Sequence, residues 1–168
     1  MAPKVIPQIK KILYVTDLSK NARHAFAYAI SMANRYGAGV TILHVLEDKQ
    51  SYADLLVITE LGSEKWQEIR KANEMKVMEM LKGRLQDFCG EASSELPECP
   101  FITDEVLVKI GDPVEEILKE AYEKNYDLVV MGAHGHGMIA DAMIGSVSRR
   151  VLRRCKKPVL VVRLAAEQ

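Results

Sequence analysis

The chain has 168 residues, of which 48% are hydrophobic and 27% charged, as in an ordinary soluble globular protein that can bury a core. Its 23 basic and 23 acidic residues cancel, so no global field would hold it on nucleic acid or on an anionic membrane. The three cysteines form no C-x-x-C pair and the first residues contain no long apolar run, so we expect a cytoplasmic protein without a zinc site or a disulfide framework.

Strands and helices alternate along the chain. Continuous apolar, β-branched runs indicate strands buried on both faces, at 12–15, 40–43, 128–131 and 159–162, and the more alternating segment 101–110 predicts a strand nearer an edge. Apolar spacing of three to four residues predicts helices between them, at 22–33, from Ser63 to about 88, at 114–122 and at 145–154. The third helix has the clearest start, with Asp112 as N-cap, Pro113 at the first helical position and Glu115 closing a capping box.

This order predicts an α/β fold, in which an open five-stranded parallel sheet carries helices on both faces, and we expect residues 1–168 to form a single domain. A reversal of strand order in such a sheet creates a crevice at the carboxyl ends of the strands. The one long irregular insertion, 47–62, contains the apolar run 55–58 and would form either a short packed helix or a lid or partner surface.

Polar residues follow two of the strands that face this crevice. Asp17 could accept hydrogen bonds from sugar hydroxyls, or Asp17 and Ser19 could simply cap the first helix. His44, after the second strand, is more often a structural residue at such a place.

The most informative segment is glycine-rich. Gly132, Gly135 and Gly137 follow the fourth strand, and Gly145, Ser146 and Ser148 then open a helix. Glycines permit close approach of the backbone to a ligand, and a helix N-terminus offers free N–H groups to phosphate, so the segment predicts a phosphate cradle, the alternative being a flexible loop with ordinary capping. No G-x-G-x-x-G follows the first strand and no G-x-x-x-x-G-K-[ST] occurs, which disfavours a dinucleotide dehydrogenase and excludes a Walker-type NTPase.

On these residues the chain resembles the universal stress proteins, whose nucleotide-binding members carry G-x2-G-x9-G-[ST]. Gly132, Gly135, Gly145 and Ser146 fit every fixed position, and KKILYVTDLS, TILHV, DLVVMGAHG and GSVSRRVLRRCKKPVLVVR match in register. The resemblance implies a Rossmann-like, adenine nucleotide alpha hydrolase-like fold and a stress-response regulator that binds ATP or AMP. Two departures are Val15, where binding members often have Pro, and Ala133, where they often have Ser or Thr.

The resemblance also implies a role for each part of the site. Asp17, with Val15 and Thr16 beside it, would contact adenosine, and the backbone of Val45 would meet the adenine. Gly132 would lie under the ribose near Met131 and His134. The phosphates would be held by Gly135, Gly145, Ser146, Val147 and Ser148, with magnesium or manganese bridging them. The family also pairs subunits through the last strand, here Pro158 to Arg163, whose short apolar edge is itself a pairing template.

Two other features are given simpler interpretations. The basic residues of 149–157 are interpreted as a solvated face rather than a nucleic-acid site, and His134-x-His136 lacks a third ligand for a metal. No catalytic constellation can be argued from spacing, and the resemblance implies little or no hydrolysis. The alternatives are a weak ATPase, an autophosphorylating protein with Ser146 or Ser148 as acceptor, and a nucleotide-free dimerisation module.

Overall fold

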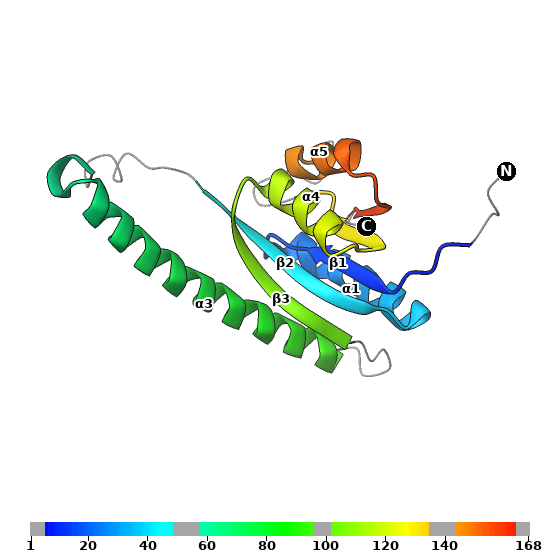
Figure 1. The fold of residues 1–168 in the computed structure, drawn as a ribbon. Coiled ribbons are helices and arrows are strands. Elements are labelled where there is room, and N and C mark those ends of the chain that lie inside the picture. Colours follow the sequence, from blue (N-terminus) through cyan, green and yellow to red (C-terminus); the bar gives the residue numbers. More distant parts are fainter. Residues whose placement is uncertain (1–5, 49–57, 96–101, 135–143, 164–168) are drawn as a thin grey trace.

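Five parallel strands form one sheet in the computed structural model, which describes residues 6–48, 58–95, 102–134 and 144–163 (Figure 1). The strand order is β3-β2-β1-β4-β5. The strands are β1 (Lys11–Val15), β2 (Gly39–Glu47), β3 (Ile102–Gly111), β4 (Leu128–Gly132) and β5 (Val159–Val162). The helices between them are α1 (Lys20–Tyr36), α3 (Ser63–Glu95), α4 (Pro113–Glu123) and α5 (Ser146–Arg154). The predicted α/β fold is therefore confirmed, and β3 lies at an edge of the sheet as expected.

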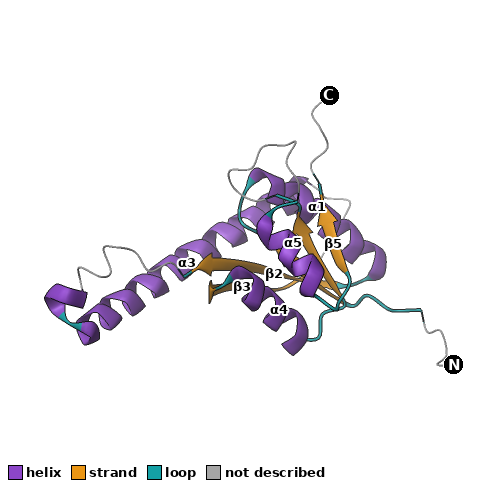
Figure 2. Cartoon of the chain, turned by 90° about the horizontal axis from the view of Figure 1, so that it is seen from above, coloured by secondary structure: helices purple, strands orange, loops and turns teal. Residues whose placement is uncertain are grey.

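The sheet buries both of its faces, because alternate side chains of the central strands enter two different apolar layers. Ile12 and Tyr14 of β1 pack on the side of α1 and of the C-terminal half of α3. Leu13 of the same strand packs on the side of α4 and α5. Figure 2 shows α1 and α4 on opposite sides of the sheet. This double burial explains why the central strands are continuously apolar in sequence.

Helix ends follow local sequence with one exception. Gly37 ends α1 in the left-handed conformation, with φ of 63°. Asp112 caps α4 as predicted, and its carboxylate accepts from the Val114 and Glu115 amides at 3.0 Å each. The predicted capping box was wrong in its second half, because the Glu115 carboxylate instead forms a bidentate pair with Arg154 of α5, at 2.5 and 3.1 Å. A guanidinium gives a carboxylate two charged donors, which is stronger than one neutral amide.

The long helix α3 extends beyond the sheet (Figure 1). Its C-terminal half is anchored in the core by Leu81 and Leu85, whereas Arg70 of its first half pairs with Asp48, directly after β2. The segment predicted as an irregular insertion, 47–62, is partly regular: Glu47 ends β2 and residues 58–61 form one helical turn. Residues 49–57, which hold most of its apolar run, lie outside the described residues.

Candidate functional site

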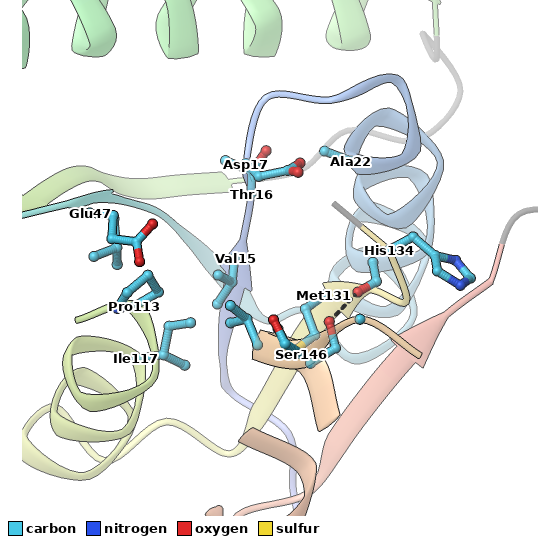
Figure 3. A pocket seen from close by; sticks show the side chains of 15 residues that line it. Val15, Thr16, Asp17, Ala22, Glu47, Pro113, Ile117, Met131, His134 and Ser146 are labelled. Carbon is cyan, nitrogen blue, oxygen red and sulfur yellow. Dashed lines mark hydrogen bonds between the residues drawn. The ribbon is translucent and has the colours of Figure 1, made fainter. Parts of the chain in front are cut away.

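A cavity of about 420 Å³ opens where the strand order reverses, between β1 and β4 at their carboxyl ends. This is where ligands bind in open α/β sheets, and the volume is in the range of small-molecule sites. Figure 3 shows Glu47, Pro113 and Ile117 on one side of the cavity, Met131 and Ser146 on the other, and Val15 between them.

The turn after β1 forms one wall and is ordered by its own side chains. The Leu18 amide donates to Thr16 Oγ1 and the Ser19 amide donates to Asp17 Oδ1, both at 3.0 Å. Ser19 is the N-cap of α1, since its hydroxyl accepts from the Ala22 amide at 3.3 Å. The two expectations for this turn are thus divided: Ser19 caps the helix, and Asp17 braces Ser19 while lining the cavity.

Beneath this turn, a buried tyrosine joins β1 to the first turn of α1. The Tyr14 hydroxyl donates to the Ala22 carbonyl at 2.6 Å. Burial raises the pKa of this phenol far above its ordinary value, although a hydrogen bond with Thr16 opposes that shift. The phenol therefore stays protonated, and it keeps this hydrogen bond at any ordinary pH.

The end of β2 forms the next wall. Val45 lines the cavity, as does Glu47 two residues further along the same face of the strand. His44 is not among the lining residues; its Nδ1 lies 2.8 Å from the Thr16 carbonyl oxygen and so holds the β1 turn against β2. These contacts support a structural role for His44.

The third wall is the start of α5. Gly145 is its N-cap and makes no side-chain cap, and the first helical hydrogen bond runs from the Arg149 amide to the Gly145 carbonyl at 2.9 Å. The amides of Ser146, Val147 and Ser148 therefore lack acceptors within the helix. The buried Ser148 hydroxyl donates to the Gly132 carbonyl at 2.8 Å, whereas Ser146 is exposed. Only the Ser146 hydroxyl is thus free to face a ligand here, while Ser148 ties α5 to the end of β4.

The structure brings most of the predicted site residues to this cavity. Those that line it are Val15, Thr16, Asp17, Val45, Met131, Gly132, His134, Gly145, Ser146, Val147 and Ser148. The His134 ring is directed away from the other labelled side chains in Figure 3. Gly135 lies outside the described residues; among those described, the Gly145 amide donates to the Ala133 carbonyl at 2.8 Å.

Four lining residues were not predicted from sequence: Ala22, Glu47, Pro113 and Ile117. Pro113 was identified only as the first residue of a helix, and nothing local shows that this helix leans over the cavity. The apolar run of the second strand ends at 43, so the longer extent of β2, which brings Glu47 to the site, comes from its pairing with β3.

The basic residues of α5 lie mostly in ion pairs or in solvent. Arg154 pairs with Glu115, and Arg150 lies 3.8 Å from Asp112. Hydrogen bonding to Arg154 lowers the pKa of the Glu115 carboxyl. Among the described residues, no cluster of three or more His, Cys, Asp or Glu could hold a metal ion, and no helix there is both long and apolar enough to cross a membrane.

Comparisons with known proteins agree with this geometry. The model of the universal stress protein family matches residues 8–163. Universal stress protein MJ0577 of Methanocaldococcus jannaschii is 30% identical over 158 residues, which cover 92% of this chain and 94% of that protein. The solved structure of MJ0577 superposes with a TM-score of 0.74 at 27% identity, covering 96% of this chain and all of the other.

Two more distant structures share the fold and were solved with nucleotides. A universal stress protein in complex with cAMP has a TM-score of 0.59 at 21% identity, over 94% of this chain and 98% of its own. One from Archaeoglobus fulgidus in complex with dAMP has a TM-score of 0.55 at 18% identity, over 92% and 98%.

Proposed function

The chain belongs to the universal stress protein family, and we propose that it is a cytoplasmic stress-response regulator that binds an adenine nucleotide, ATP or AMP, in the cavity between β1 and β4. The observation that carries this proposal is the start of α5, where three residues whose amides have no acceptor within the helix line the cavity. That two proteins of the same fold hold cAMP and dAMP is consistent with it.

The phosphates would lie at the start of α5. Amides of Ser146, Val147 and Ser148 offer donors, and the helix dipole adds positive potential at the same place. The exposed Ser146 hydroxyl would add a fourth donor. Because the described residues supply no metal cluster, a magnesium or manganese ion would be held chiefly by the phosphates themselves.

The nucleoside would occupy the other end. Val15, Pro113 and Ile117 would offer an apolar slot for a flat base, and the Asp17 carboxylate, which also lines the cavity, would accept hydrogen bonds from ribose hydroxyls. Val45 would meet the adenine through its backbone. Odd residues of β2 direct their N–H and C=O groups towards β1, since Gly39 donates to the Lys10 carbonyl and Leu43 accepts from the Thr16 amide. The peptide groups of Val45 point the same way, past the end of β1 at Val15 and into the cavity.

We propose that the protein binds its nucleotide rather than acting on it as an enzyme. If the protein phosphorylated itself, Ser146 would be the better acceptor of the two serines. Ser148 is buried, and its hydroxyl donates to the Gly132 carbonyl. Mass spectrometry of copurified small molecules and titration calorimetry with ATP and AMP test nucleotide binding. A folded protein that binds neither would overturn the proposal in favour of a nucleotide-free module, and steady phosphate release would favour a weak ATPase.

We also propose a homodimer that pairs two copies of β5 within the segment Pro158 to Arg163. β5 is an edge strand, bonded to β4 through the Pro158 and Val162 carbonyls, which accept from the Val129 and Ala133 amides at 2.9 and 2.7 Å. Backbone groups of even residues therefore face β4, and those of Val159 and Val161 face outward. A two-fold axis would pair these outward groups antiparallel.

The alternation of inward and outward backbone groups along β5 allows a test of the dimer. Val161→Pro removes an outward N–H and is tolerable on an edge strand, so the protein should stay folded and become monomeric. Leu160→Pro removes an inward N–H and should unfold the edge, which makes it the matched control. Sedimentation equilibrium at tens of micromolar measures the state; a monomer of 18.8 kDa for the unaltered chain would refute the dimer.

A further inference from the structure

The backbone hydrogen bonds between β1 and β2 end at Val15 and Thr16, although both strands continue far enough for two more. The last backbone rung is donated by the Thr16 amide to the Leu43 carbonyl at 2.9 Å, and pairing ends at Val15 and Leu43. In a parallel ladder the next two rungs would run from the Val45 amide to the Thr16 carbonyl, and from the Leu18 amide to the Val45 carbonyl.

Two side chains occupy the places of those two rungs. His44 Nδ1 lies 2.8 Å from the Thr16 carbonyl oxygen, and because a carbonyl only accepts, Nδ1 must carry the proton. Thr16 Oγ1 accepts from the Leu18 amide at 3.0 Å. Leu18 itself has a φ of 64°, a left-handed backbone conformation that is unfavourable for a residue with a β-carbon.

We propose that His44 and Thr16 are positioning residues that end the ladder with their side chains and so free both peptide groups of Val45 for the nucleobase. This inference rests on the proposed function. One residue that presents an N–H and a C=O side by side matches adenine, which offers a ring nitrogen acceptor beside an amino donor. Hypoxanthine carries an N–H and a carbonyl at those two positions and is mismatched at both.

The decisive variants change the donor at position 44. His44→Leu keeps the bulk of the side chain but removes the donor, so the Thr16 carbonyl becomes free to take the Val45 amide. His44→Asn places an amide donor near the position of Nδ1 and is the conservative control. We expect His44→Leu to bind ATP roughly 2- to 10-fold more weakly, which is the worth of one neutral hydrogen bond, with inorganic tripolyphosphate unaffected. The preference for ATP over inosine triphosphate should shrink with it, and His44→Asn should restore both.

Amide hydrogen exchange gives a second readout that needs no ligand. In the unaltered protein the Val45 amide should exchange fast beside a protected Leu43 amide, and in His44→Leu it should become protected. A Val45 amide already protected in the unaltered protein would overturn the inference, as would equal losses for ATP and tripolyphosphate or unchanged ATP affinity in His44→Leu. If the unaltered protein bound no nucleotide, the proposed function would fail, and exchange alone would decide the ladder.

Discussion

Replacing Ser146 by proline is the most direct test of the phosphate end of the cavity. Ser146 is the first residue of α5, and its amide has no acceptor within the helix. Proline suits this position because it lacks only an N–H that the helix does not use. Gly145 already has φ of −57° and ψ of 160°, the extended backbone that a residue before proline prefers. The chain accepts the same arrangement in α4, which begins with Pro113.

The expected loss follows from the one bond removed. A hydrogen bond to a charged group contributes about 1.5–3 kcal/mol, so loss of the amide should reduce the affinity for ATP roughly 10- to 150-fold. Ser146→Ala removes the hydroxyl and keeps the amide, so the difference between the two variants isolates the amide. Adenosine, which has no phosphate, should bind both variants alike.

Titration calorimetry at fixed salt with ATP and adenosine provides these affinities, and thermal unfolding checks that α5 is intact. A folded Ser146→Pro variant that binds ATP as tightly as Ser146→Ala would refute the phosphate assignment. An equal loss for adenosine would show instead that the substitution had moved the start of α5.

Three further predictions concern the nucleoside end and the core. Asp17→Ala should weaken the binding of ATP by roughly 1.5–3 kcal/mol more than the binding of tripolyphosphate. Asp17→Asn is the control, because it keeps an acceptor for the Ser19 amide. Equal losses of affinity for both ligands in calorimetry would show that Asp17 only stabilises the start of α1. Burial raises the pKa of the Cys89 thiol from 9.0 to about 11, so the folded state retains a proton that the unfolded chain loses, and the free energy of unfolding should fall between those pH values. Urea titrations should find a smaller fall in Cys89→Ala. Lys109→Met should cost about 3–5 kcal/mol, because the buried Glu120 carboxylate would lose the ammonium 2.6 Å away; the double variant with Glu120→Gln should recover much of that stability in the same assay.

Sequence periodicity was sufficient for the fold because the central strands are apolar on both faces and α1 and α4 begin at side-chain caps. Asp112 and Pro113 located the start of α4 to the residue. Local signals failed where a partner distant in sequence competes for a group. Glu115 had the spacing of a capping box, but Arg154, 39 residues away, binds its carboxylate instead. The extent of β2 beyond residue 43 could not be predicted from local sequence either, because it depends on pairing with β3.

The site was more predictable at its glycine-rich end than at its base end. A glycine before a helix and the hydroxyl of Ser146 are visible in sequence, and both line the cavity. The base end depends on which peptide groups the sheet leaves unpaired, and these can be identified only once β1 and β2 are placed in register. His44 shows the difficulty: its spacing indicates only a structural histidine, and its consequence for Val45 is visible only beside Thr16.

That dependence on backbone also bears on the two departures from the family pattern. The Ala133 side chain is buried, and it is absent from the described residues that line the cavity, while its amide and carbonyl bond to Val162 and Gly145. Its missing hydroxyl therefore removes no group that faces the cavity. Val15 contributes an apolar side chain to the wall, where a proline would contribute another. The groups on which the proposal depends are main-chain amides of α5 and of Val45, which any side chain in the same backbone conformation would leave in place. We therefore expect Ala133→Ser to leave ATP affinity unchanged, whereas Ser146→Pro, which alters the main chain itself, should not.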